Sequence, residues 1–262
     1  MKINKLKYYD LTRELAITGF KMKYQGSFFG YLWSLMKPLF LFLILYIVFN
    51  NVFKLGSTIP YYAVYLLLGI TLFQFFVETT SMCMGSIVGN GDLIRKVYFP
   101  RIIMPIAISL TSFATLILNL VVVAGFAMFS KVPFTFNIFI LPLYLVEFYI
   151  FTISVSLFLA AIFVKFRDIG PIWEVIAQGL FYATPILYPT SLVPTRFLKI
   201  LMLSPLAQVI QGARSTIISG NITTSWSVLG WYSVIPFILV ITILGISYMV
   251  FQKMAAKFAE EV

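Results

Sequence analysis

Three carboxyl side chains stand inside otherwise apolar stretches of the sequence, and they are the groups best suited to acid–base chemistry. These are Glu78, which follows Gln74 by about one helical turn, and Glu147 and Glu174. A carboxyl group inside a membrane span costs free energy and usually faces the bundle interior or a watery cavity. Two interpretations stay open. One is a proton relay, although the sequence supplies neither a histidine nor a matched cation for it; the other is polar contact within a helical bundle or near a membrane interface.

The motifs of common enzyme chemistries are absent from the sequence. It has no histidine and a single cysteine, Cys83, which excludes histidine-ligated zinc, histidine-based triads and a disulfide framework. No GxxxxGK[ST] phosphate loop, GxSxG or HExxH motif occurs. We therefore expect no enzyme, no ATP hydrolysis by this chain and no cofactor of its own.

The composition of the chain is that of a membrane protein. Of its 262 residues, 61% are hydrophobic and 11% are charged, and the mean hydropathy is +0.98. Soluble domains are typically about 45–50% apolar and about 25% charged. The net charge of +10 is explained by the Lys and Arg of cytoplasmic loops, so we expect no nucleic-acid partner. Because no long polar stretch could form a second core, we predict a single transmembrane domain over residues 1–262.

Six apolar stretches are long enough to cross a bilayer as helices, which requires about 20 residues for about 30 Å of hydrocarbon. The predicted spans are 30–53, 62–88, 102–129, 138–164, 171–188 and 228–251. The fold class is therefore an all-α polytopic membrane protein with six transmembrane helices. The fifth span, 171–188, is the shortest.

The distribution of charge predicts how these spans are oriented. With a cytoplasmic N-terminus, the outside segments hold only Lys54, Lys131, Arg196, Lys199 and Arg214. All other lysines and arginines then lie inside, as the positive-inside rule requires. We predict a multi-pass protein with both termini in the cytoplasm.

Residues 5–24 precede the first span and have the pattern of an amphipathic helix. Lys7, Asp10, Glu14 and Lys21 fall on one narrow face of such a helix, and apolar side chains spread over the rest. We expect it to lie in the headgroup plane with its charges toward water. Packing against a soluble protein is the alternative.

The loop between the second and third spans contains another short helix. Its sequence, GNGDLIRKVYFPR (89–101), has an Asn-Gly turn signal near its start, and Pro100 ends or redirects the helix. Arg95 and Lys96 keep it out of the hydrocarbon, while its apolar residues are suited to docking a partner. A loop helix resting on the bilayer is the alternative.

The segment 189–220 lies outside, before the last span. Pro189, Pro194 and Pro205 separate semi-apolar pieces, and the spacing of apolar residues over 206–217 predicts a helix. Apolar pieces of about 10–14 residues are more often re-entrant or interfacial than transmembrane. We predict one or two short helices that dip in from outside. Irregular backbone at that depth must be buried in protein or line a watery cavity, which indicates the mouth of a pathway.

Aromatic residues are more numerous than two interfacial belts require, with 27 Phe, 15 Tyr and 4 Trp. Many of them fall in the middle of the predicted spans. Contact with lipid accounts for most of these rings. Rings that line a conduit would suit sugars, whose C–H faces pack on aromatic surfaces.

Four segments with polar signatures carry a resemblance to a known family. They are FKMKYQGSFFGYLWSLMKPL (20–39), RKVYFPRIIMPIA (95–107), FVKFRDIG (163–170) and SPLAQVIQGARSTII (204–218). In this order they resemble the permease subunit of bacterial type 2 ABC exporters, specifically the polysaccharide branch that exports lipid-linked O-antigen or teichoic acid. The resemblance covers nearly the whole chain.

The resemblance implies a homodimer of this chain and two copies of a separate ATP-binding subunit, which would hold ATP and Mg. It implies an interface helix at 5–24, a coupling helix at 91–98 that docks on the ATPase, and gate helices within 189–220. The coupling-helix residues are Gly91, Asp92, Leu93, Ile94, Arg95, Lys96, Val97 and Tyr98.

The resemblance also implies a conduit lined by aromatic residues of the first, second and fifth spans. The candidates are Tyr31, Trp33, Phe40, Phe76, Phe181 and Tyr182. Lys and Arg bind phosphate oxygens well, and the candidates for the substrate diphosphate at the inner interface are Lys21, Lys23, Lys37 and Arg101. Generic positive-inside charge is the alternative for each cation.

The function implied by the resemblance is export of undecaprenyl-diphosphate-linked polysaccharide across the bacterial inner membrane, driven by ATP hydrolysis in the partner. The expected partners are the lipid-linked glycan, membrane lipids and the ATPase. Two alternatives stay open. One is a type 2 ABC exporter of teichoic acid, a drug or another lipid, and the other is a proton-coupled carrier that uses Glu78, Glu147 or Glu174.

Overall fold

The computed structural model describes residues 5–24, 30, 32–57, 59–97, 99–218 and 222–261, and this part of the chain is helical with no strand. Its α-helices are α1 (Lys5–Tyr24), α2 (Leu32–Ile47), α3 (Tyr62–Met84), α4 (Gly91–Lys96), α5 (Ile103–Phe129), α6 (Leu141–Lys165), α7 (Ile169–Ala183), α8 (Thr195–Met202), α9 (Pro205–Ile217), α10 (Ser225–Leu229), α11 (Val234–Ala255) and α12 (Phe258–Glu261). A π-helical turn, Val48–Val52, continues α2, and 3-10 turns precede α6 and α11. The prediction of an all-α fold is confirmed.

Five helical segments of the described chain are long and apolar enough to cross a membrane. They are Leu32–Val52, Tyr62–Met84, Ile103–Phe129, Phe136–Lys165 and Ser225–Ala255. Each coincides with a predicted span, and the chain is a multi-pass membrane protein. The remaining predicted span, 171–188, falls on α7. Its 15 residues rise about 22 Å, which is less than the roughly 30 Å of the hydrocarbon core.

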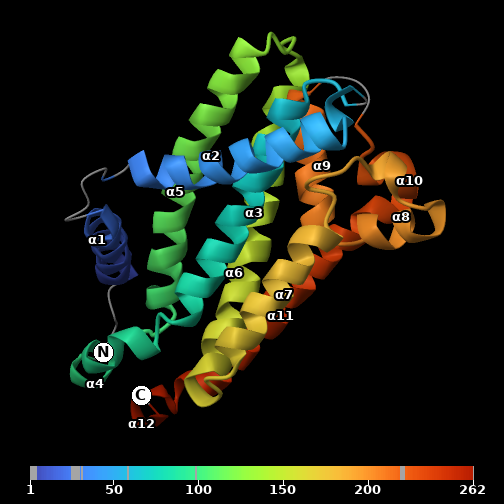
Figure 1. The fold of residues 1–262 in the computed structure, drawn as a ribbon. Helices are drawn as coiled ribbons and strands as arrows, with labels where there is room; N and C mark the ends of the chain where they lie inside the picture. Colours follow the sequence, from blue (N-terminus) through green and yellow to red (C-terminus); the bar gives the residue numbers. More distant parts are fainter. Residues whose placement is uncertain are drawn as a thin grey trace.

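The central helix of the bundle is α3. Its side chains are buried along most of its length, and Leu66, Leu68 and Leu72 are fully enclosed. The long helices α5 and α6 pack along it, and α2, α7 and α9 contact other parts of it (Figure 1). Protein rather than lipid therefore surrounds most of α3, and the other elements take their places against it.

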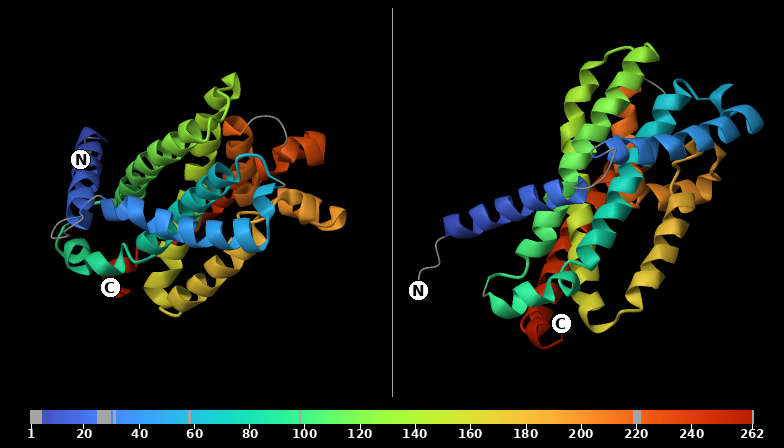
Figure 2. Two further views of the ribbon diagram at one scale, coloured as in Figure 1. Left: turned by 45° about the horizontal axis from the view of Figure 1, so that its top comes forward. Right: turned by 60° about the vertical axis from the view of Figure 1, so that its left-hand side comes forward.

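The first span runs across the bundle rather than along it. In Figures 1 and 2, α2 crosses α5 and α3 at a steep angle, and these two helices are its main contacts. Phe42 is buried there, edge-on to Phe126 of α5 with 5.5 Å between the ring centroids. Leu43 and Ile44 on the other side of α2 are exposed. One face of α2 thus meets the protein, and the other is left to lipid or to a partner within the membrane.

The N-terminal helix α1 forms over the predicted residues and packs against the side of α5. Thr111 Oγ1 in α5 donates a hydrogen bond of 3.0 Å to the backbone carbonyl of Ala16. The charged side chains of Asp10, Glu14 and Lys21 are exposed. The bundle therefore fixes one face of α1, and its predicted charged face stays free of the core.

Between α7 and α11 the described residues form three short α-helices, α8, α9 and α10. Pro205 stands at the start of α9, where its missing N–H removes no helical hydrogen bond. Nearly all of α9 is buried, with contacts to α3, α6 and α11, whereas α8 and α10 project to one side (Figure 1). The helix predicted over 206–217 is confirmed. Enclosure by protein is the condition that a helix too short to span must meet at membrane depth.

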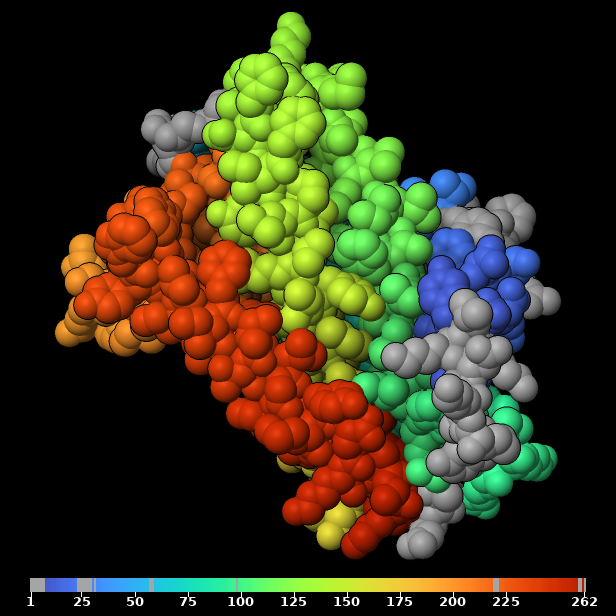
Figure 3. Space-filling model, turned by 180° about the vertical axis from the view of Figure 1, so that it is seen from behind, coloured from blue at the N-terminus to red at the C-terminus, as the bar shows by residue number. Residues whose placement is uncertain are grey.

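The loops predicted to be cytoplasmic lie together. Figure 1 shows α4, α12 and the turn between α6 and α7 at one end of the bundle, and the connection between α5 and α6 at the other. On the reverse side, α11, α6 and α5 lie side by side in one broad face (Figure 3). These helices carry many exposed apolar side chains, among them Val121, Ile241 and Met249. So extensive an apolar surface is suited to lipid and not to water.

Close packing of α9 against α6 depends on Gly212. A Cβ atom built on Gly212 would lie 2.3 Å from Cε1 of Tyr144 in α6. We expect Gly212→Ala to force these helices apart and to lower the free energy of unfolding by about 1–3 kcal/mol, the usual cost of overpacking a core. Thermal unfolding of the purified protein measures this loss. Gly125→Ala in α5 is the matched control because a Cβ there meets nothing within 4 Å; equal unfolding midpoints for the two variants would contradict the prediction.

Candidate functional site

Side chains of α2, α3 and α7 line an open groove with a volume of about 560 Å³. Its walls combine aromatic, apolar and charged side chains. Among them are Phe181, Tyr182, Lys37, Glu78 and Glu174, which the sequence singled out for separate reasons. The fold brings them together because α7 lies alongside α3, while α2 crosses the same helix.

The aromatic wall of the groove is built by α3 and α7. Phe181 is edge-on to Phe73, with 5.2 Å between ring centroids, and edge-on to Tyr182, with 5.4 Å. Edge-to-face contacts at these separations are the preferred geometry of aromatic pairs. Phe73 is buried, whereas Tyr182 is 60% exposed. The wall is therefore anchored in the core and presents its outer ring to the groove.

Charged groups of both signs line the same groove. Lys37 of α2 and Glu174 of α7 are exposed, and Glu78 of α3 is half-buried. This agrees with the expectation that carboxyl groups within spans face a watery cavity. Glu147 lies elsewhere: it is 6% exposed in α6, and neither carboxylate oxygen has a hydrogen-bond partner in the described chain. Glu78 and Glu174 thus line the same groove, and Glu147 lies outside it.

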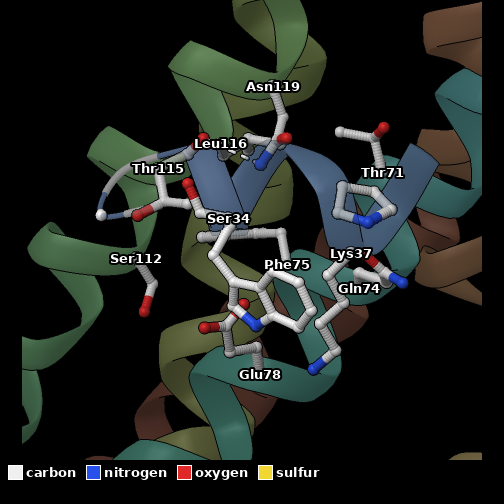
Figure 4. Close-up of a pocket in the computed structure, with 13 residues that line it drawn as sticks. Ser34, Lys37, Thr71, Gln74, Phe75, Glu78, Ser112, Thr115, Leu116 and Asn119 are labelled. Carbon is white, nitrogen blue, oxygen red and sulfur yellow. Dashed lines mark hydrogen bonds between the residues drawn. The ribbon is translucent and has the colours of Figure 1, made fainter. Parts of the chain in front are cut away.

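A second cavity, of about 270 Å³, lies between α2, α3 and α5. Lys37, Gln74 and Glu78 line both this cavity and the groove. Figure 4 shows side chains from all three helices around this space. Trp33, a predicted conduit residue, lines this cavity and not the groove. We call it the polar cavity because most of its lining side chains carry hydroxyl, amide or charged groups.

A buried arginine that the sequence did not predict holds the segment just beyond α7. Arg214 of α9 is 0% exposed. Its Nε donates to the carbonyl oxygen of Tyr65 at 3.0 Å, and its guanidinium lies 3.4 Å from the centroid of that ring. Its Nη1 and Nη2 donate to the carbonyl oxygens of Pro185 and Ile186, the latter at 2.8 Å. These carbonyls lie just beyond the end of α7, where no further helical turn supplies a donor.

Gly69 makes room for this guanidinium. A Cβ atom on Gly69 would lie 2.2 Å from Nη2 of Arg214, closer than packed atoms approach. Arg214 thereby joins α9, α3 and the end of α7. The only signal in the sequence was one arginine in the apolar helix 206–217, which the charge distribution placed among the outside charges.

A short helix, α4, forms where the coupling helix was predicted, at one end of the bundle (Figure 1). Ile94 is 5% exposed and belongs to the same apolar cluster as Phe258 of α12. Arg95 and Lys96 are exposed in its last turn. The helix ends at Lys96 because Val97 is already extended. Tyr98 lies outside the described residues.

Not every predicted conduit residue reaches the groove. Phe40 is 47% exposed on α2 and lines neither cavity. Phe76 is 1% exposed and stacks on Phe151 of α6 with 5.4 Å between ring centroids, so it is a core residue. Tyr31 lies outside the described residues.

The predicted diphosphate ligands lie on separate elements. Lys21 is exposed on α1, Lys37 lines both cavities, and the guanidinium of Arg101 donates to the carbonyl oxygen of Ala255 at the end of α11. The side chain of Lys23 is outside the described part of the structure. The structure does not gather Lys21, Lys37 and Arg101 into one site.

Comparison with known proteins gives one family. A family model described as ABC-2 type transporter matches residues 11–218, from α1 through α9. An O-antigen export system permease protein RfbA of Klebsiella pneumoniae is 28% identical over 261 residues, which are 99% of this chain and 98% of that protein. A protein of the same name from Myxococcus xanthus is 29% identical over 199 residues, 75% of each chain. The chain therefore belongs to the ABC-2 type transporter family, as a membrane permease subunit that works with a separate ATP-binding subunit.

Proposed function

We propose that two copies of this chain form the path by which undecaprenyl-diphosphate-linked polysaccharide of the O-antigen type crosses the bacterial inner membrane. The observation that carries the proposal is the groove between α2, α3 and α7, with its aromatic wall and its polar side chains. The full-length similarity to permeases named for O-antigen export supports the same substrate class. Energy comes from ATP hydrolysis in the partner subunit.

The open shape of the groove favours a symmetric dimer. A groove on one subunit becomes a closed path when an identical subunit covers it, and two-fold dimers are the commonest assembly of this kind. Ring faces at Phe181 and Tyr182 suit the C–H faces of sugars, and Gln74 and Gln178 add amide groups for their hydroxyls. Such a wall holds a sugar chain loosely and lets it slide.

We propose that α7 is the sixth membrane element, although it is short. Ile172 and Val175 on it are 51% and 70% exposed, which is suited to lipid or to a second copy. Beyond its end, the buried residues Thr184–Leu187 continue inside the protein. A sixth crossing returns the chain to its starting side, so both termini are cytoplasmic. The position of α12 at the same end as α4 supports this topology (Figure 1).

The remaining elements take roles consistent with this path. α4 docks on the ATP-binding subunit and transmits its motion, and α1 lies at the inner membrane interface. The segment 189–220, which includes α8 and α9, forms the outer gate; 219 and 220 lie outside the described residues. Lys21 and Arg101 contribute positive charge for the diphosphate at the inner interface, while Lys37 shares the groove with Glu78 and Glu174.

Transport by reconstituted vesicles tests the proposal. Inverted vesicles that contain this permease and its ATPase receive lipid-linked glycan, and the glycan that becomes protected inside is measured with and without ATP. We expect ATP-dependent protection in the wild type and about 10-fold less in Phe181→Ala/Tyr182→Ala, because aromatic contacts are worth about 0.5–1.5 kcal/mol each. Phe129→Ala/Phe139→Ala is the control, since these rings are 88% and 73% exposed and line neither cavity.

Other outcomes of this assay identify the alternatives. Export of teichoic acid, a drug or another lipid in place of the glycan would keep the family mechanism and change the substrate. Transport without ATP that follows a pH gradient would favour the proton-coupled carrier. Full transport activity of Phe181→Ala/Tyr182→Ala would show that the glycan does not pass through the groove.

A further inference from the structure

The polar cavity (Figure 4) is not used by the proposed path, although Lys37, Gln74 and Glu78 line both it and the groove. Its volume of about 270 Å³ is slightly below the usual range for small-molecule sites, about 300–1,000 Å³. At roughly 30 Å³ per water it would hold about nine waters. It has room for a ligand of about one ring with its substituents.

The position of the polar cavity makes its lining costly. Thr71 lies near the middle of α3, and Ser112 and Thr115 lie near the middle of α5, both of which are membrane-spanning helices. A polar group taken out of water without a hydrogen bond costs about 1–3 kcal/mol by protein measurements. The hydroxyl and amide side chains at this depth are therefore stable only if water or a polar ligand in the cavity forms hydrogen bonds with them.

Ser112 is a lining side chain whose hydroxyl group receives no hydrogen bond from the described protein. It is 3% exposed, and its hydroxyl oxygen is buried without a hydrogen-bond partner in the described chain. Its neighbours Thr111 and Thr115 behave differently, since each donates to the carbonyl oxygen one turn earlier, at 3.1 and 3.2 Å. A hydroxyl that forgoes this local bond and lines a cavity remains available to a ligand.

The charges and rings of the cavity restrict the ligand class. One lysine, Lys37, and one carboxylate, Glu78, leave the lining close to neutral, which disfavours a phosphate or a metal ion. Gln74 and Asn119 can both donate and accept hydrogen bonds. Trp33 and Phe75 supply ring surfaces for an apolar face. A small neutral molecule with many hydroxyl groups and one C–H face matches this combination.

We infer that the polar cavity is a binding site for a single neutral sugar residue. It rests on the proposed function in one respect, the source of the sugar. Lys37, Gln74 and Glu78 line both spaces, so a shift of these long side chains would admit a branch or end residue of a glycan from the groove to the cavity. The site then binds one sugar residue of the glycan during transport and contributes to the substrate specificity of the permease.

Ligand-observed saturation-transfer NMR on the permease–ATPase complex tests the inference. The complex is placed in lipid nanodiscs without glycoside detergents, whose sugar headgroups would compete, and a panel of methyl hexosides and N-acetylhexosaminides is added. We expect transfer to at least one sugar. Ser112→Ala should weaken its binding about 2- to 10-fold, the share of one hydrogen bond, and Asn119→Leu should weaken it about 10-fold or more.

The matched control is Ser86→Ala. The hydroxyl of Ser86 is also buried without a partner in the described chain, but it lines neither cavity. Loss of an unpartnered hydroxyl should leave both alanine variants folded, so a difference in sugar binding between them reports the site. Absence of transfer to wild type, or equal binding in Ser112→Ala, Asn119→Leu and Ser86→Ala, would leave a cavity filled by water only.

Failure of this inference is distinguishable from failure of the proposed function. Wild-type vesicles that export glycan while the complex binds no sugar overturn the cavity site and leave the path intact. Sugar binding that is lost in Phe181→Ala/Tyr182→Ala but kept in Ser112→Ala and Asn119→Leu assigns the sugar to the groove and also overturns the inference. Sugar binding that is lost only in the cavity variants, in a complex that exports no glycan, supports the site and removes the proposed source.

Discussion

Replacing Arg214 with alanine is expected to destabilise the permease strongly. The substitution removes the guanidinium donors from the carbonyl oxygens of Tyr65, Pro185 and Ile186. The Tyr65 oxygen keeps its helical hydrogen bond within α3, and the Pro185 oxygen keeps the Tyr65 hydroxyl at 3.5 Å, so of these three only the Ile186 oxygen is left unsatisfied by the described chain. One unsatisfied acceptor costs about 1–3 kcal/mol and each of the two other lost hydrogen bonds about 0.5–1.5 kcal/mol, a loss of about 2 kcal/mol or more. At roughly 2–4 °C per kcal/mol for a chain of about this size, the unfolding midpoint falls by about 4–8 °C or more.

Thermal unfolding of the purified permease, followed by size-exclusion chromatography, measures this effect. Arg214→Lys should recover little, because one ammonium group cannot reproduce the fork of donors that a guanidinium presents. Arg196→Ala is the matched control, since Arg196 is an exposed arginine of α8 that stacks on neighbouring Phe197. If the unfolding midpoints of R214A and R196A are equal, Arg214 does not hold the end of α7 against α3.

Reversing Arg95 and Lys96 to glutamate is expected to abolish export while the permease still inserts and folds. Both side chains are exposed at the end of α4, whereas Ile94 between α4 and the bundle is buried. The change alters the charge on the face that we propose to dock the ATP-binding subunit, without touching the core contact of Ile94. If the partner subunit meets these cations with negative charge, the reversal replaces attraction with repulsion, and like charges placed together across an interface cost several kcal/mol. Reversing two should therefore lower the amount of ATP-binding subunit that co-purifies by about 10-fold or more.

The measurements are ATPase co-purification and ATP-dependent glycan export from the same membranes. A double reversal of Arg196 and Lys199 on α8 changes the net charge equally, on exposed residues away from α4, and should leave co-purification intact. Normal export by the Arg95→Glu/Lys96→Glu permease would remove α4 as the coupling element. Lost co-purification in both double variants would indicate a general effect of net charge.

Local features of the structure followed from the sequence because their causes are local. The length of an apolar stretch and the spacing of charges on one helix require no knowledge of neighbours. Accordingly α1 has the predicted bounds, five predicted spans coincide with membrane-length helices, and α4 forms where a short helix between two spans was expected. The order of polar segments also led to the right family, whose model covers residues 11–218.

Which side of each membrane helix faces the protein, the lipid or the groove could not be predicted from the sequence in the same way. In soluble proteins the apolar side of a helix marks the core, but lipid is as apolar as a core, so a membrane helix is apolar all round. Phe76 and Phe181 are equally aromatic and both mid-span, yet one is enclosed among rings of α6 and the other lines the groove. Only the packing of α3 between its neighbours separates them.

The sequence by itself determined the class of this protein: a multi-pass, all-helical permease subunit without a phosphate loop. The tertiary structure decided the site. It laid α2 across α3, joined Lys37, Glu78 and Glu174 in one groove, and left Glu147 apart. It also buried Arg214 against a carbonyl 149 positions away in sequence, in space that only Gly69 leaves open. Such contacts depend on the meeting of distant segments, and no local pattern of residue types records them.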